Sequence, residues 1–324
     1  MQFLETYLNR FQTHLSEHAF QGQPHSLYEP CNYIMSLGGK RVRPSLVIMA
    51  CDLYSDEMNR AMPLALSIEI FHNFTLMHDD IMDRSPIRRG LATVHEKYDE
   101  NTAILSGDAM LIKAYSLLHL SPPQVFPAIF ETFNVMAKEL CEGQRLDMDF
   151  ETKIQVSISE YIHMIELKTA VLLGAALKIG ALAGNAPLED AEHLFEFGRN
   201  IGIAFQIHDD LLDTFGGADV GKKIGGDIRQ NKKTYLFLKA LELAGEEVKQ
   251  ELLNIYSGQT IMSEEEKVER VTSIFKSLLV EEYANQVKDA YKDLAMSHLV
   301  SLHIPSEKRN VLEMFAEYLI GRKK

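Results

Sequence analysis

The sequence predicts an all-α protein folded as one large helical domain over residues 1–324. Apolar residues recur at three- and four-residue spacings through long segments, and no segment shows the two-residue alternation of a half-buried strand. The ten prolines fall mostly between these periodic segments. No Asn-Gly or Asp-Gly pair separates two β-branched runs, as a hairpin would favour. The length alone would suggest about two domains, but no Ser- or Pro-rich linker divides the chain.

Four long helical segments are expected along the chain, at residues 61–82, 124–150, 160–182 and 191–215. Glycine and proline predict breaks at residues 38–39, 85–90, 121–123, 184–187 and 216–217. The most apolar stretch, 170–184, contains Lys178. It has about 15 residues, fewer than the roughly 20 that cross a bilayer. We therefore expect it to be a buried core helix, in a chain of ten or more helices without a membrane span.

Composition excludes several classes of protein. Hydrophobic residues make up 46% of the chain, enough for a sizeable core, and the formal net charge is −13. A globally acidic chain is poorly suited to nucleic acid, because phosphate neutralisation needs clustered cations. Three cysteines without a CxxC pair indicate a reducing compartment rather than a disulfide scaffold. The first residues lack a basic region followed by an apolar core, so no signal peptide is evident and we expect a cytoplasmic protein.

An aspartate pattern occurs twice. Residues 77–83 read MHDDIMD, and residues 207–213, 130 positions later, read IHDDLLD. In each copy two aspartates lie four residues apart on one helix face, and a third directly follows the first. The six are Asp79, Asp80, Asp83, Asp209, Asp210 and Asp213. Two ordinary acidic helix ends are the plain alternative. Like charges at this spacing destabilise a bare helix, however, so a cation is expected, and Mg²⁺ prefers a few carboxylates plus substrate phosphates.

Basic residues accompany both aspartate patterns. A glycine break precedes three cations in GGKRVRP at 38–44, and Arg88-Arg89-Gly90 follows the first pattern. The second is followed by GKKIGGD at 221–227 and by Lys232-Lys233. Guanidinium groups and backbone N–H groups freed by glycine suit phosphate oxygens. A metal-complexed diphosphate is therefore the favoured ligand, although a basic loop alone is more often a solvated surface.

These residues resemble the trans-isoprenyl diphosphate synthases, also called polyprenyl synthetases. The resemblance extends from about residue 38 to residue 235. It rests on GGKRVRP, MHDDIMD with RRG, EGQRLD, ELKTA, FQIHDDLLD and GKKIGGDIRQNKKT, which occur in the family's order. It implies an isoprenoid-synthase type all-α fold, with the two aspartate motifs facing each other across a central cavity, and a homodimer. It also implies a head-to-tail (1′-4) condensation of isopentenyl diphosphate with an allylic diphosphate: dimethylallyl, geranyl or farnesyl.

The resemblance assigns roles to individual residues. About three Mg²⁺ ions would be coordinated by Asp79, Asp83 and Asp209, with Asp80, Asp210 and Asp213 in support. The allylic diphosphate would be bound by Arg88, Lys168, Lys223 and Lys232. Isopentenyl diphosphate would be bound by Gly39, Lys40, Arg43, His72 and Arg89. Lys168, Thr169 and Gln206 would form the catalytic set, in which Thr169 and Gln206 would steady the carbocation. Without the family, His72 would be read as an ordinary helix histidine and Lys168 as a surface lysine.

Product length is expected to depend on aromatic residues before the first motif. Phe74 lies five residues before Asp79, and Phe71 lies three residues further back. Two core aromatics at helical spacing are the commoner reason for such a pair. In the family, an aromatic at this position closes the tunnel and limits products to C15–C20. Thr75 is not a second aromatic, and the first motif has no two-residue insertion. These features favour C20 geranylgeranyl diphosphate, with C15 farnesyl diphosphate next.

Other functions stay open at this point. A longer-chain polyprenyl diphosphate synthase would share every motif. A class I terpene cyclase would carry one DDxxD motif and need no isopentenyl diphosphate site. An HD-type phosphohydrolase is suggested by His-Asp doublets at 78–79 and 208–209, but it needs imidazole ligands. A non-catalytic partner subunit would usually have lost motif aspartates, and all six are present here.

Overall fold

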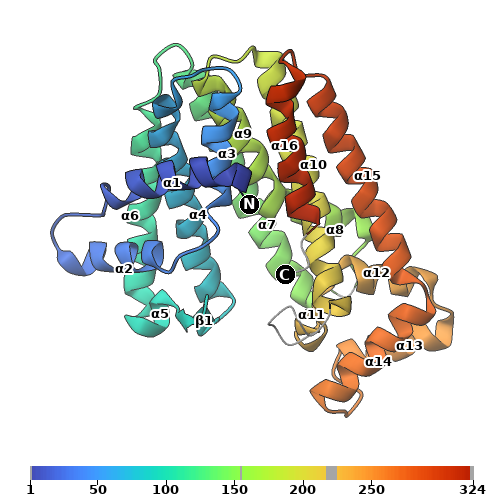
Figure 1. The fold of residues 1–324 in the computed structure, drawn as a ribbon. Coiled ribbons are helices and arrows are strands. Elements are labelled where there is room, and N and C mark those ends of the chain that lie inside the picture. Colours follow the sequence, from blue (N-terminus) through green and yellow to red (C-terminus); the bar gives the residue numbers. More distant parts are fainter. Residues whose placement is uncertain (1, 154, 217–224, 322–324) are drawn as a thin grey trace. The chain divides into compact units, whose positions relative to one another are not determined.

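The computed structural model describes residues 2–153, 155–216 and 225–321, and helices make up nearly all of its regular structure (Figure 1). The first elements are α1 (Gln2–Ser16), α2 (His25–Ser36), α3 (Val42–Asp52), η1 (Met58–Ala61), α4 (Met62–Met82), β1 (Ile87–Arg88), β2 (Leu91–Ala92), α5 (Val94–Lys97) and α6 (Glu100–Leu118). Then come α7 (Phe126–Thr152), α8 (Ile158–Ile165), η2 (Glu166–Ala170), α9 (Val171–Ala183) and α10 (Leu188–Phe215). The last are α11 (Gly226–Arg229), α12 (Tyr235–Leu243), α13 (Glu246–Tyr256), α14 (Glu264–Ser277), α15 (Val280–Val300) and α16 (Ser306–Ile320).

The predicted all-α class is confirmed, and the four expected segments are helical. They correspond to α4, to α7, to α8 through α9, and to α10. Within the third segment, residues Glu166–Ala170 form a π-helical turn, η2, which the periodicity did not predict. The apolar stretch 170–184 is largely α9, a buried helix as expected. Within the described residues, no helix is long and apolar enough to cross a membrane.

A short hairpin was not predicted. Strands β1 and β2 pair antiparallel, with Ile87 opposite Ala92 and Arg88 opposite Leu91. Arg89 and Gly90 form its turn with φ of 54° and 81°. Positive φ at both central residues is typical of a type I′ turn, which usually carries Asn-Gly or Asp-Gly. The hairpin was not predicted because Arg89 stands in the first turn position, where Asn or Asp is usual.

Local sequence explains where several helices begin. Asp99 accepts a hydrogen bond from the Thr102 N–H at the start of α6. Ser157 with Glu160 forms a capping box before α8, and Ser263 with Glu266 forms another before α14. Such boxes satisfy two of the helix's unpaired N–H donors.

The chain divides into two compact units, each built from separate stretches. Unit 1 comprises Met1–Val135, Leu173–Phe195 and Leu302–Arg309. Unit 2 comprises Met136–Leu172, Glu196–Ser301 and Asn310–Lys324. The expectation of a single domain over 1–324 stays a prediction.

Unit 1 has its core around α3 and α4. α4 lies beside α6 (Figure 1), and it also contacts α3. α4 has 21 residues, of which twelve in its Met62–Met77 part are buried, as is Asp80. In a helix buried on several faces, a polar side chain needs a partner inside the protein. This places strict demands on the polar residues of α4, among them the first aspartate motif.

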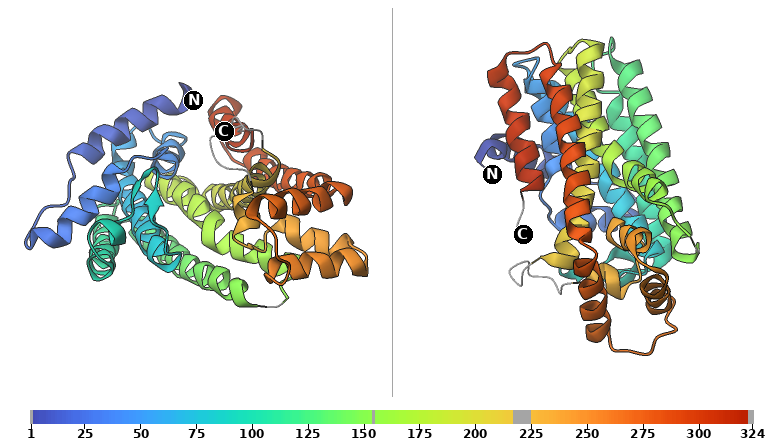
Figure 2. Two further views of the ribbon diagram at one scale, coloured as in Figure 1. Left: turned by 90° about the horizontal axis from the view of Figure 1, so that it is seen from below. Right: turned by 90° about the vertical axis from the view of Figure 1, so that its right-hand side faces the viewer.

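Unit 2 has a core in which α8, α10 and α12 through α15 take part. Its large apolar residues include Ile207 and Leu211 of α10, Phe237 of α12 and Phe275 of α14. Figure 2 shows α13 and α14 lying next to one another, and they are in contact. The second aspartate motif is on α10, so its buried face is held by this core.

Candidate active site

The first aspartate motif lies at the end of α4. The Asp83 N–H donates to the Asp79 carbonyl oxygen at 2.8 Å, so the helical spacing continues through the motif. Asp79 has 22% of its side chain exposed, and Asp83 is exposed. Asp80 is only 2% exposed. The motif therefore presents the Asp79 and Asp83 pair at the surface of unit 1 and directs Asp80 inward.

Arg88 on β1 holds the buried aspartate. Its Nε donates to both carboxylate oxygens of Asp80, at 2.9 and 2.8 Å, and its Nη2 lies 2.8 Å from Oδ1. The same nitrogen is 3.9 Å from Oδ2 of Asp79. Burial raises the pKa of Asp80, and the Arg88 hydrogen bonds oppose that rise. Arg88 thus lies next to the predicted metal ligands, while its contact with an allylic diphosphate stays a prediction.

Four of the residues predicted to bind isopentenyl diphosphate are gathered in unit 1. Nη1 of Arg43 lies 3.2 Å from Nε2 of His72, and Nη1 of Arg89 donates to the Gly38 carbonyl oxygen. A Cβ at Gly39 would lie 2.9 Å from the Arg89 guanidinium carbon. Burial, and then the charges of Arg43 and Arg89, lower the pKa of His72 well below its usual value. Uncharged histidine beside two guanidinium groups makes a site that suits an anion.

A buried ion pair beneath this group was missed by the sequence reasoning. Nη1 of Arg41 donates to Oε1 of Glu69, and Nη2 donates to the Met35 carbonyl oxygen. Nδ2 of Asn73 donates to the same Glu69 oxygen at 2.9 Å. Glu69 inside the mostly apolar run 64–71 was the signal that could have indicated a buried charge, though not its partner. Lys40, which precedes Arg41 and is predicted to bind isopentenyl diphosphate, is exposed.

The second aspartate motif, on α10, repeats the exposure pattern with other partners. Asp209 is partly exposed, whereas Asp210 is 3% exposed. The Tyr161 hydroxyl donates to Oδ2 of Asp210 at 2.5 Å, and the Tyr235 N–H approaches the same oxygen at 3.4 Å. Burial, followed by repulsion from Asp227, raises the pKa of Asp210 to about 8. The sequence predicted two equivalent motifs, but the partners of their buried aspartates differ.

Asp213 closes the second motif by capping the following short helix. Its Oδ1 accepts from the Gly226 N–H at 3.2 Å and its Oδ2 from the Asp227 N–H at 2.9 Å. Nζ of Lys232 lies 3.8 Å from Oδ1 of Asp227. These contacts fit the supporting role expected of Asp213 and keep Lys232 near the motif. Lys223, also predicted to bind diphosphate, lies outside the described residues.

The π-helical segment η2 carries two of the three residues predicted to be catalytic, Lys168 and Thr169. Nζ of Lys168 donates to Oδ2 of Asp147 at 2.5 Å. The Thr169 hydroxyl lies 3.5 Å from Oε1 of Gln206, one turn before the second aspartate motif. A Cβ at Gly143 would lie 2.3 Å from the Lys168 backbone nitrogen, so α7 packs directly against η2. π-Helical turns are frequent at functional sites, and this one places Thr169 beside Gln206 and Lys168 beside Asp147.

The two aromatic residues predicted to limit product length are both buried in unit 1. Phe71 is 1% exposed and Phe74 is 8% exposed. Their ring centroids are 5.6 Å apart, and Phe71 packs against Phe133 of α7 at 5.1 Å. Phe74 also contacts the His78 ring at 4.8 Å. A Cβ at Gly107 of α6 would fall 2.2 Å from Nε2 of His78, so this face of α4 is pressed against α6.

The structure brings predicted residues together within each unit. The first motif, the guanidinium groups and the aromatic pair belong to unit 1, and the second motif belongs to unit 2 with η2. The convergence of both motifs on common ions across a central cavity stays a prediction. Within each unit the donor set fits Mg²⁺, because the outer side chains of each motif are carboxylates at least partly exposed, and Mg²⁺ prefers oxygen ligands.

Comparisons with known proteins agree with this chemistry. The family described as Polyprenyl synthetase matches residues 24–276. A geranylgeranyl diphosphate synthase of Methanosarcina mazei is 40% identical over 306 residues, covering 93% of this chain and 91% of its own. A geranylfarnesyl diphosphate synthase of Natronomonas pharaonis is 35% identical, covering 93% and 91%. A crystal structure of a geranylgeranyl pyrophosphate synthase superposes with a TM-score of 0.93 at 41% identity, covering 99% of both chains. We conclude that the chain belongs to the polyprenyl synthetase family and is a prenyltransferase.

Proposed function

We propose that the protein condenses isopentenyl diphosphate head-to-tail with an allylic diphosphate in a Mg²⁺-dependent reaction. The product is a short trans-prenyl diphosphate, C20 geranylgeranyl diphosphate in the first place and C15 farnesyl diphosphate next. One observation carries the proposal: each aspartate motif buries its middle aspartate, while its first and last aspartates are at least partly exposed. Burying the middle carboxylate against a fixed partner orients the end of each helix, and the first carboxylate of each motif then lies at a partly exposed position.

The allylic diphosphate is held by the exposed aspartates through bound metal. Mg²⁺, when bound by Asp79, Asp83 and Asp209, neutralises the charge that develops on the departing diphosphate. Arg88 fixes the first motif through Asp80 and has a second nitrogen near Asp79. A guanidinium so placed also meets the diphosphate oxygens. Lys168, Lys223 and Lys232 complete the cationic side in the same proposal.

Isopentenyl diphosphate has no bond to ionise, so it needs a cationic site rather than metal. Arg43, His72 and Arg89 supply this site with Gly39 and Lys40. The buried Glu69 beneath them balances the charge of Arg41. This carboxylate keeps several guanidinium groups close together without unbalanced repulsion.

Carbon–carbon bond formation then follows ionisation of the allylic substrate. The isopentenyl double bond attacks the allylic carbocation, and a proton leaves the new cation, for which the released diphosphate is the base. Thr169 and Gln206 lie side by side with their oxygen dipoles near the second motif. These dipoles stabilise positive charge without acting as nucleophiles in the proposal.

Product analysis tests the proposal. The full chain is incubated with labelled isopentenyl diphosphate, Mg²⁺ and, in turn, dimethylallyl, geranyl and farnesyl diphosphate. Elongation to C20 supports it. Cyclic hydrocarbons would identify a terpene cyclase, and released phosphate without elongation would identify a phosphohydrolase. Products beyond C25 would favour the longer-chain synthase, which stays the alternative.

Matched aspartate variants connect the activity to the motifs. Asp79→Asn and Asp209→Asn each lower kcat by about 10²- to 10³-fold, because each removes a charged ligand at the developing charge. Asp289→Asn, on α15 with its side chain 63% exposed, is the control and retains activity. Chelation of Mg²⁺ abolishes turnover, and added Mg²⁺ restores it. Full activity of both motif variants would overturn the assignment of the motifs.

We also infer a homodimer, with the protein located in the cytoplasm. α6 exposes Leu105 at 59% and Ile112 at 68%, seven residues apart on one face, and α7 exposes Phe130 and Val135. The two helices are adjacent here, since the Tyr115 hydroxyl donates to Oδ1 of Asn134 at 3.1 Å. Large apolar side chains exposed on two adjacent helices are typical of an interface, and a second copy of the chain is the occupant we propose.

Light scattering after gel filtration tests the dimer. Leu105→Glu with Ile112→Glu is expected to give monomers, because each charge would be buried without a partner. Ile261→Glu, at a loop position that is fully exposed, is the control and leaves the dimer intact. A monomeric wild type, or a dimeric double variant, would contradict the inference. Cell fractionation of the full chain tests its location.

A further inference from the structure

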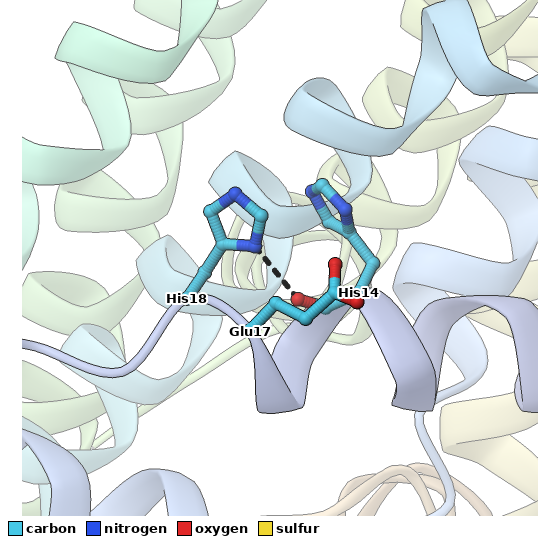
Figure 3. Close-up of side chains that lie close together, drawn as sticks. All are labelled: His14, Glu17 and His18. Atoms are coloured by element: carbon cyan, nitrogen blue, oxygen red, sulfur yellow. Dashed lines mark hydrogen bonds between the residues drawn. The ribbon is translucent and has the colours of Figure 1, made fainter.

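A cluster of metal-ligating side chains lies at the end of α1, apart from the residues assigned above. His14, Glu17 and His18 each offer a ligand atom, and these atoms lie within 4.8 Å of one another. Figure 3 shows the two imidazole rings and the Glu17 carboxylate gathered on one side of the helix end. It is the single group of three such ligands found among the described residues.

The two histidines are arranged as ligands of one ion. They lie four residues apart, a spacing that puts side chains on the same helix face, and their ring centroids are 4.0 Å apart. Nδ1 of His18 lies 2.7 Å from the His14 carbonyl oxygen. A carbonyl only accepts hydrogen bonds, so Nδ1 carries the proton and Nε2 has its lone pair available. Metal-bound histidines almost always donate their other N–H in this way, because that bond fixes the ring.

The size of the cluster suits a small divalent ion after a modest adjustment. Tetrahedral zinc with bonds of about 2.0–2.1 Å places its ligand atoms about 3.3 Å apart. The present separations of up to 4.8 Å therefore need to close by roughly 1.5 Å. Glu17 and His18 are exposed and His14 is half-buried, so side-chain rotation can achieve this.

The ligand chemistry separates this cluster from the aspartate motifs. Mg²⁺ prefers oxygen ligands, whereas two imidazoles and one carboxylate suit zinc and leave a fourth position open. We propose that His14, Glu17 and His18 bind one Zn²⁺ ion at the end of α1. The ion joins the last turn of α1 to the segment that follows, which Asn32 of α2 holds by hydrogen bonds to the Phe20 backbone. The site is therefore structural, independent of prenyl transfer.

Zinc retention in a large excess of Mg²⁺ tests the proposal, because Mg²⁺ then occupies the carboxylate sites. Full-length protein is equilibrated with zinc chloride, and bound zinc is measured by metal analysis after gel filtration. The wild type is expected to retain one equivalent. His14→Ala with His18→Ala is expected to lose it, and Glu17→Gln to bind at least about tenfold more weakly, as for loss of a supporting ligand group. Zinc raises the thermal midpoint of the wild type but not of the double variant.

Two further variants make each outcome decisive. His25→Ala removes another exposed histidine and keeps the zinc. Asp79→Asn with Asp209→Asn abolishes prenyl transfer under the proposed function and also keeps the zinc. The proposal fails if the wild type holds no zinc in excess Mg²⁺, if the double histidine variant retains it, or if the aspartate variant loses it. Because the two histidines lie at the surface, their substitution should leave the fold unchanged, and circular dichroism checks this.

Discussion

Replacing Phe74 by alanine is expected to lengthen the product. If the growing prenyl tail runs from Asp79 along α4, it meets Phe74 five residues away, about 7.5 Å along the helix axis. Phe74 cannot readily yield, because its ring is buried against Phe71 and His78. Removing the ring lets the tail advance to Phe71, the next aromatic on the same face.

The helix geometry gives the size of the effect. Phe71 lies three residues beyond Phe74, which is about 4.5 Å of helix. An isoprene unit adds four carbon–carbon bonds to the tail and extends it by about 5 Å. Phe74→Ala should therefore add one unit, so a C20 wild type would become a C25 enzyme. Phe71→Ala combined with Phe74→Ala should add a further unit by exposing Phe133.

The assay is chromatography of dephosphorylated products from a common farnesyl primer. Deleting a buried phenylalanine costs about 3–5 kcal/mol of stability, so the matched control is Phe275→Ala in the unit 2 core, where the ring is 1% exposed. That variant loses comparable stability and keeps the parental length. If Phe74→Ala also releases only the parental product, Phe74 does not limit the tail and the assumed path along α4 is wrong.

Three other changes have outcomes that the structure predicts. Glu69→Gln breaks a buried ion pair and should lower the free energy of unfolding by about 3–5 kcal/mol, and urea denaturation with a loss under about 1 kcal/mol would contradict this. Gly143→Ala places a Cβ against the Lys168 backbone. It should cost about 1–3 kcal/mol and lower kcat, whereas wild-type turnover would show that η2 tolerates movement. The Asp190 hydrogen bond and charge raise the pKa of His303. Its stabilisation is therefore complete below about pH 6.5 and lost as pH rises through the folded pKa. The thermal midpoint should accordingly fall more between pH 6 and 8 in the wild type than in His303→Gln, and parallel curves would refute this.

Much of the fold was predictable because helical periodicity is a local property. The breaks at glycine and proline positions separated α4, α7 and α10 correctly. The π-helical turn was not predictable from periodicity, and its close contact with α7 at Gly143 is distant in sequence. The β1–β2 hairpin was missed because its turn uses Arg89 where Asn or Asp is usual.

The candidate site shows the same division between local and distant information. The spacing of Asp79 and Asp83 indicated which carboxylates share a face, and their exposure agrees with it. Sequence could not reveal that Glu69 pairs with Arg41, because 28 positions separate them. It also could not reveal what surrounds each buried aspartate, since those partners come from β1 in one case and from α8 in the other.

Because their surroundings differ, the two aspartate motifs are not interchangeable, although their sequences are nearly the same. The inner aspartate of the first copy rests against a permanent cation, whereas that of the second rests against a phenol and has a pKa of about 8. A cation therefore balances the buried charge of the first copy, whereas burial and the nearby Asp227 favour the protonated form in the second. Transplanting HDDIMD into α10, or HDDLLD into α4, would therefore transfer the motif sequence but not the partners that set the charge of its buried aspartate.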